Sequence, residues 1–209
     1  MRKKLGENLE REWAKEAFPQ ELWNAARTLR TSRLWGLNEL SKLAAQGSPL
    51  AMMYLGHALV KSGSESDVKT GCTWLMKSAE AGSIEGRLQL AIHYKQQAEG
   101  ERAQSELSAL VAQGYTPAMY LLASILYDGK IVERDLTQAI HLLKTACSAG
   151  HLPSHAFLSS IYRKERVGFI AKLRSYWLCL AKIPAFIWYL WRHPNSDCMR
   201  PLRLPHNNA

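Results

Sequence analysis

The sequence of 209 residues carries a formal net charge of +9, with 47% hydrophobic and 22% charged residues. This composition is typical of an ordered globular protein and excludes a largely disordered chain. The positive charge is concentrated in residues 163–209, which hold nine Lys and Arg residues and two acidic ones. Because the rest of the chain offers no basic stripe, binding to nucleic acid is not expected.

Residues 1–31 are predicted to form N-terminal capping helices. Apolar residues recur there at helical spacing until a proline interrupts them: Leu5, Leu9, Trp13, Ala17 and Pro19. Amphipathic helices at the end of a helical solenoid cover the apolar face of the first repeat. No apolar run typical of a secretory signal follows the first basic residues, so a cytoplasmic location is expected.

From residue 32 onward, a five-residue motif that ends in glycine occurs four times, as LAAQG, SAEAG, LVAQG and ACSAG. The glycines lie 35, 32 and 36 residues apart, and a leucine follows each glycine by eight residues. A period in this range on a helical pattern is typical of a solenoid built from helix pairs. These repeat positions are Gly47, Gly82, Gly114, Gly150, Leu55, Leu90, Leu122 and Leu158.

Each repeat position has a physical interpretation. The glycine suits a left-handed residue that ends a helix, and small residues eleven before and four after it let the two helices of a pair approach closely. Fifteen residues before the glycine stand polar residues suited to begin the preceding helix, among them the predicted N-caps Asp67 and Asp135. Aromatic and methionine residues at repeat offsets are expected in the core: Trp74, Tyr94, Tyr127, Tyr162, Met52, Met53, Met76 and Met119.

These copies resemble the Sel-one-like repeat, a tetratricopeptide-like unit. The fullest copy matches at Leu126, Tyr127, Gly129, Asp135, Ala139, Leu143, Ala146, Gly150 and Leu158. The resemblance spans residues 32–162 and implies an all-α, right-handed solenoid of antiparallel helix pairs. It also implies a scaffold that binds a protein or peptide on its concave face, in bacteria often within envelope, polysaccharide or motility assemblies.

No pattern of residues predicts catalysis. His151 and His155 are four apart, but Pro153 lies between them and no carboxylate completes an HExxH-like zinc site. No phosphate-binding glycine loop, GxSxG motif or nucleophile–base arrangement occurs. The four cysteines show no regular pairing and are expected to be reduced thiols. We therefore expect no enzyme activity, no metal and no cofactor.

Residues 163–193 form a predicted basic, aromatic helical segment, and a tail of residues 194–209 is expected to be poorly ordered. Residues 167–193 contain no acidic residue, and an interruption by lysine and proline makes a transmembrane span marginal. Three roles are open: a cap on the last repeat, docking to a membrane surface or membrane protein, or contact with a soluble partner. The candidate docking residues are Lys172, Arg174, Trp177, Lys182, Trp188, Tyr189 and Trp191.

The sequence thus predicts a bacterial cytoplasmic adaptor, held peripherally at the inner membrane through residues 167–193. The alternative is a soluble regulatory or signalling repeat protein whose C-terminal segment only caps the solenoid.

Overall fold

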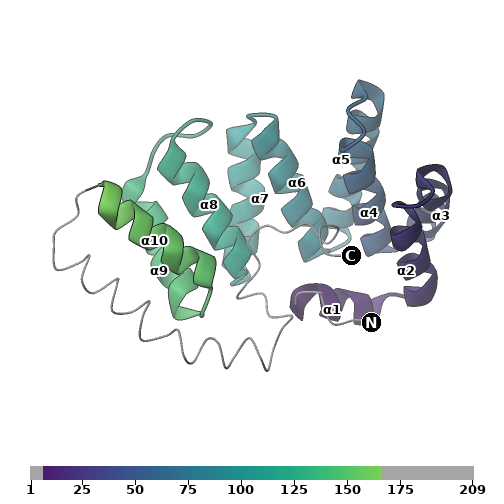
Figure 1. Ribbon diagram of the computed structural model, residues 1–209, viewed down its shortest axis with the longest axis horizontal. Coiled ribbons are helices and arrows are strands. Elements are labelled where there is room, and N and C mark those ends of the chain that lie inside the picture. Colours follow the sequence, from purple (N-terminus) through teal and green to yellow (C-terminus); the bar gives the residue numbers. More distant parts are fainter. Residues whose placement is uncertain (1–6, 166–209) are drawn as a thin grey trace. The chain divides into compact units, whose positions relative to one another are not determined.

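The computed structural model describes residues 7–165, which form ten helices and no strand. In chain order these are α1 (Glu7–Lys15), α2 (Pro19–Thr28), α3 (Arg33–Ala45), α4 (Pro49–Val60), α5 (Glu65–Glu80), α6 (Ile84–Gln96), α7 (Gly100–Ala112), α8 (Thr116–Asp128), α9 (Leu136–Ser148) and α10 (Leu152–Lys164). From α2 onward, short connections join the helices into antiparallel pairs (Figure 1). The predicted all-α fold of antiparallel helix pairs is confirmed.

The chain divides into two compact units. The N-terminal unit comprises residues 8–110, and the C-terminal unit includes residues 111–165. The boundary falls near the end of α7.

The repeat glycines end helices. Gly47, Gly82, Gly114 and Gly150 have φ values of 91°, 85°, 77° and 85°, in the left-handed region that favours glycine. After Gly47, the amide of Ser48 returns to the carbonyl oxygen of Leu43 at 3.2 Å. This return bond is the Schellman closure of a helix C-terminus, and it turns the chain directly into α4.

The leucines that follow the glycines lie in the core. Leu55, Leu90, Leu122 and Leu158 are all buried, with at most 8% of their surface exposed. Their burial on the helix after each glycine explains why this position is leucine in every copy.

The small residue four after the glycine acts as predicted at Gly86, where an added Cβ would lie 2.7 Å from Ser78 Cβ in α5, but the small residues eleven before the glycine act differently. A Cβ added to Gly71 would lie 2.7 Å from the carbonyl oxygen of Gly56, so α5 approaches α4, the helix before it, at this point. A Cβ added to Gly36 would lie 2.7 Å from the backbone nitrogen of Leu29, which also precedes it. The position eleven before the glycine therefore serves contact with the preceding segment, and the predicted contact with the helix after the glycine is wrong at these two positions.

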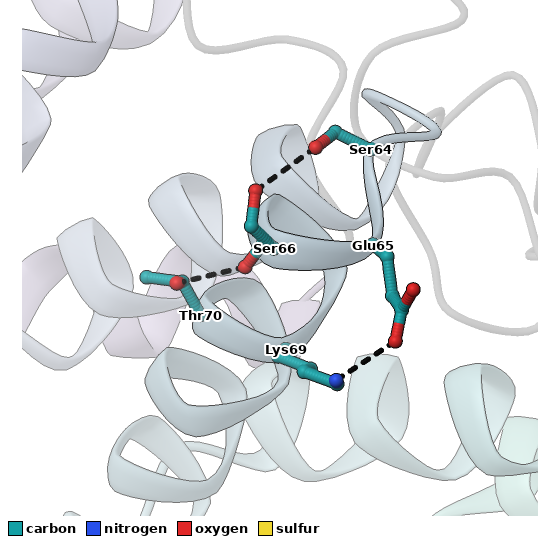
Figure 2. Close-up of polar contacts among 5 residues, drawn as sticks. All are labelled: Ser64, Glu65, Ser66, Lys69 and Thr70. Carbon is teal, nitrogen blue, oxygen red and sulfur yellow. Dashed lines mark hydrogen bonds and ion pairs between the residues drawn. The ribbon is translucent and has the colours of Figure 1, made fainter.

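The prediction that Asp67 is an N-cap is also wrong. Helix α5 begins at Glu65 after an extended Ser64, which leaves Asp67 inside the first turn. Gly63, with φ of 80°, lets the chain turn early enough for this earlier start. Figure 2 shows the polar contacts of this helix start, including the Lys69–Glu65 ion pair at 2.8 Å.

Most of the expected aromatic and methionine core residues are buried or half-buried. Met76 is the exception, because 41% of its surface is exposed. It follows Leu75 by one position and is therefore rotated by about 100° from the buried side of the helix. Tyr94, Tyr162, Met53 and Met119 are buried, whereas Trp74, Tyr127 and Met52 are half-buried.

Candidate protein-interaction site at the N-terminal ends of α4 and α6

Helices α4 and α6 each begin with a serine directly after a repeat glycine. Ser48 Oγ accepts a hydrogen bond from the amide of Ala51 at 3.0 Å, and Ser83 Oγ accepts one from the amide of Gly86 at 2.9 Å. These are side-chain N-caps, and they satisfy one of the amides that a helix start leaves without an internal partner. Both hydroxyl groups remain free to donate one further hydrogen bond.

Two carboxylates one helical turn apart accept those bonds. Ser83 Oγ donates to Glu12 Oε2 at 2.6 Å, and Ser48 Oγ donates to Glu16 Oε2 at 2.7 Å. Glu12 Oε1 also accepts from the amides of Ile84 and Glu85 at 2.8 and 3.2 Å, and Glu16 Oε1 accepts from that of Leu50 at 3.0 Å. Glu12 thus connects α1 to the first turn of α6, and Glu16, which directly follows the last residue of α1, connects this segment to the first turn of α4. Anions are favoured at helix N-termini, where the backbone amides and the helix dipole point outward.

Apolar contacts complete the attachment of α1, which lies crosswise at one end of α4 (Figure 1). Leu9 and Trp13 are its buried apolar side chains. The Trp13 ring lies 6.0 Å from that of Trp23 in α2 and 6.2 Å from that of Tyr54 in α4, measured between centroids. The buried Trp13 Nε1 has no hydrogen-bond acceptor among the described residues, an arrangement that costs about 1–3 kcal/mol. We call the N-terminal turns of α4 and α6 with Tyr54 the α1-binding surface.

Burial changes the acidity of Glu12. Desolvation raises its pKa to about 7, and the nearby Glu85 carboxylate acts in the same direction. The hydrogen bonds from Ser83, Glu85 and Ile84 oppose the rise without cancelling it. Glu12 is therefore partly protonated near neutral pH, and removing its carboxylate from water weakens the attachment of α1.

The other two helices that follow repeat glycines begin differently. Tyr115 stands at the start of α8 and His151 at the start of α10, and neither side chain caps its helix. The buried His151 instead shares a hydrogen bond of 2.7 Å between its Nδ1 and Ser154 Oγ. The pair of serine N-caps that bind carboxylates is thus confined to the first two of these four helices.

An aromatic cluster characterises the C-terminal unit. The Phe157 ring lies 5.6 Å from the rings of both Tyr120 and Tyr127, with edge-to-face geometry. The Arg134 guanidinium lies 5.3 Å from the Tyr127 ring centre and pairs with Glu165. The aromatic side chains are half-buried, so this cluster offers a second surface with aromatic anchors of the kind found in protein interfaces.

One helix carries a buried polar face that the other copies lack. Glu85, Gln89 and His93 follow one another at four-residue intervals on α6, and each is at most 5% exposed. The same repeat offsets hold Leu50, Tyr54 and Ala58 in α4 and Pro117, Leu121 and Ile125 in α8. Burial lowers the pKa of His93, although the Glu99 carboxylate opposes this shift.

The candidate docking residues all fall outside the described part of the chain: Lys172, Arg174, Trp177, Lys182, Trp188, Tyr189 and Trp191. Within residues 7–165, no three His, Cys, Asp or Glu side chains gather as a metal site would require. None of the described helices is both long and apolar enough to span a membrane.

Sequence reasoning missed Glu12 and Glu16. It found the apolar side of α1, since Leu9 and Trp13 are buried, but treated the helix as a cap on the first repeat alone. Two signals were present: the four-residue spacing of the glutamates, and serine after the glycine in the first two copies only.

The paired helices, left-handed glycine turns and recurring buried leucines define a helix-pair repeat protein. The Sel1 repeat family model matches residues 49–83 and 116–151, which begin with α4 and α8 respectively. The chain therefore contains Sel1 repeats, and the resemblance found in its sequence is confirmed.

Two solved bacterial structures are similar. One is c5321, a protective antigen present in uropathogenic Escherichia coli strains and displaying an SLR fold, with 26% identity and a TM-score of 0.55 over 67% of this chain and 32% of that one. The other is a Sel1 repeat protein from Oxalobacter formigenes, with 22% identity and a TM-score of 0.53 over 70% of this chain and 63% of that one. The second likeness shows the fold alone, and the chain spans less than two thirds of either protein. No curated protein matches the chain in sequence.

Proposed function

We propose that this chain is a non-catalytic adaptor that binds proteins or peptides through its Sel1 repeats. Sel1 repeats generally mediate protein–protein interaction, and both similar structures are bacterial. The partner protein or peptide binds on the concave face of the repeats, within a bacterial envelope, polysaccharide or motility assembly.

One observation carries this proposal: the N-terminal unit already binds a helix. It holds α1 by carboxylates at two helix starts and by the buried side chains of Leu9 and Trp13. A surface that binds a helix of its own chain has the chemistry to bind a helix or peptide of another protein. The aromatic cluster of Tyr120, Tyr127 and Phe157 adds a second surface of suitable composition.

The adaptor is tested by in-cell crosslinking and affinity purification of the tagged full chain, with Tyr120→Ala/Phe157→Ala as the surface variant. We expect a defined partner whose recovery falls in this variant. The exposed pair His141→Ala/Lys144→Ala on α9 is the control and should retain the partner. Circular dichroism shows that each variant is folded. Equal recovery of the partner by all three chains would reject the aromatic cluster as the binding site. Recovery of no defined partner would reject the adaptor role.

We further propose that residues 167–193 hold the adaptor at the cytoplasmic side of the inner membrane. Tryptophan and tyrosine favour the headgroup level, and each basic residue near an anionic surface contributes about 1 kcal/mol. Trp188 and Trp191 supply the aromatic anchors, and Lys172, Arg174 and Lys182 supply the charge.

Cosedimentation with anionic liposomes at low and high salt tests the membrane role. The full chain should sediment with the liposomes at low salt, and Trp188→Ala/Trp191→Ala should remain in the supernatant. Trp35→Ala is the matched control, because Trp35 is 49% exposed in the N-terminal unit. If the full chain does not sediment at low salt, the membrane role is rejected. The result would then favour the alternative, a soluble regulatory protein whose C-terminal segment caps the repeats.

A further inference from the structure

The attachment of α1 to the N-terminal unit has the features of a reversible contact. Helix α1 has nine residues, and isolated helices of this length are marginal in water. It is helical because it is bound, and its apolar contribution is limited to Leu9 and Trp13. By comparison, α8 buries seven apolar side chains besides Pro117: Ala118, Met119, Leu121, Leu122, Ala123, Ile125 and Leu126. Elements with so few buried contacts open most readily.

Two features of the contact oppose tight binding. The buried Trp13 Nε1–H lacks an acceptor among the described residues, and Glu12 gives up most of its hydration to reach Ser83. The Trp13 penalty arises from α1, whereas any carboxyl group bound at the start of α6 loses hydration and faces Glu85. A helix with the same two carboxyl groups and an aromatic side chain that buries no unpaired N–H would bind this surface more tightly than α1 does.

The surface itself specifies what it binds. Two helix starts, each with a serine hydroxyl and at least one backbone amide, require two carboxyl groups spaced by one helical turn. Tyr54 lies beside the α1 ring of Trp13, so an aromatic side chain next to the first carboxyl group fits there. The pattern supplied by α1 is Leu-x-x-Glu-Trp-x-x-Glu, from Leu9 to Glu16.

We propose that the α1-binding surface is a receptor for an acidic amphipathic helix of a partner protein, and that α1 occupies this receptor until such a helix displaces it. The inference rests on the proposed adaptor function and deepens it by naming the chemistry of one partner segment. Only Ala17 and Phe18 separate Glu16 from α2, so this segment stays near its site at an effective concentration on the order of millimolar. A partner helix competes with this tethered segment, so its apparent affinity equals its intrinsic affinity multiplied by the fraction of receptor that is free.

A peptide titration on the full chain tests the inference. The probe is a fluorescent synthetic peptide with the sequence of residues 5–18, and the receptor is either the wild-type chain or Leu9→Ala/Trp13→Ala, whose own α1 is weakened. We expect the variant to bind the peptide about tenfold more tightly than the wild type, because its receptor is open. Equal binding by the two folded chains, or no binding by either, would overturn the inference.

A composition-matched peptide tests the role of the carboxyl groups. It carries Glu12→Ala, Ala14→Glu, Glu16→Ala and Ala17→Glu, which moves both carboxyl groups to positions that are exposed in α1 and its linker. This peptide should bind about tenfold or more weakly, since it cannot reach Ser48 and Ser83. Equal binding of the two peptides would show that the surface binds through apolar contacts alone. That result would overturn the proposed specificity for carboxyl groups.

Two further measurements secure the result. If circular dichroism shows that Leu9→Ala/Trp13→Ala is unfolded, Glu12→Ala/Glu16→Ala in the full chain replaces it in the same titration, with the same expected and overturning outcomes. Sedimentation measures the oligomeric state of the wild type and so tests whether α1 of a second copy occupies the surface. A dimer that dissociates in these variants would assign the surface to that copy and overturn the inference. The titration needs no native partner, so its failure is distinguishable from a failure to recover a partner in cells.

Discussion

Gly56 in α4 and Gly71 in α5 face each other so closely that a Cβ added to either would lie 2.7 Å from the carbonyl oxygen of the other. No side chain fits between these two backbones. The contact fixes the distance between α4 and α5 at the centre of the N-terminal unit.

Gly71→Ala is therefore expected to destabilise the protein. Alanine favours a helix over glycine by about 1 kcal/mol, but the clash with Gly56 and with the backbone nitrogen of Val60 outweighs this gain. Overpacking of this kind costs about 1–3 kcal/mol, so the midpoint of urea unfolding should fall. A variant more stable than the wild type would show that α4 and α5 do not approach in this way.

Two aspartates at equivalent repeat positions should differ in their effect on stability. Asp135 accepts a hydrogen bond from the amide of Gln138 at 2.8 Å and caps α9, so Asp135→Ala should cost about 1 kcal/mol. Asp67 lies within the first turn of α5 and caps nothing, so Asp67→Ala should cost no more than about 0.5 kcal/mol. Urea unfolding of the two variants compares them directly, and equal losses would contradict the described start of α5.

The stability of the N-terminal unit should depend on pH through Glu12. Because its pKa is about 7 in the folded protein and 4.5 as a model value, the folded state binds the extra proton between these values. This contribution is complete below pH 4.5 and is lost as pH rises through 7. Wild type should lose more stability than Glu12→Gln between pH 5 and pH 8, since glutamine keeps an acceptor oxygen but does not titrate.

Thermal unfolding at these two pH values measures this difference. Glu101→Gln, at an exposed position of α7, is the matched control and should follow the wild type. A Glu12→Gln variant with the same pH dependence as the wild type would contradict the burial of the Glu12 carboxyl group.

The repeat fold could be predicted because its determinants are local and recur. Each glycine must adopt a positive φ, and each following leucine lies on the buried side of the next helix, so the sequence repeats both at fixed offsets. The start of α5 could not be placed from the same alignment. Its loop carries Gly63, four residues before Asp67, which lets α5 begin at Glu65.

The α1-binding surface could not be predicted from the repeat, because it joins residues far apart in the sequence. Glu12 contacts a serine 71 residues later, and the spacing of repeat positions says nothing about which side of the first helix faces them. Carboxylates on an amphipathic helix are normally assigned to its solvent side. The polar residues Glu85, Gln89 and His93 break the apolar pattern of α6 in the sequence. Only the structure shows that all three are buried.

The central claim is that two carboxyl groups of the α1 segment bind the first turns of α4 and α6, and amide hydrogen exchange measured by NMR tests it most directly. In Glu12→Ala/Glu16→Ala, the amides of Leu50 and Ile84 should lose protection by about tenfold or more, and the amides of α1 should exchange faster with them. Glu101→Ala should leave all of them unchanged. If Leu50 and Ile84 keep their wild-type protection in the double variant, α1 is not held at these helix starts and the account is wrong.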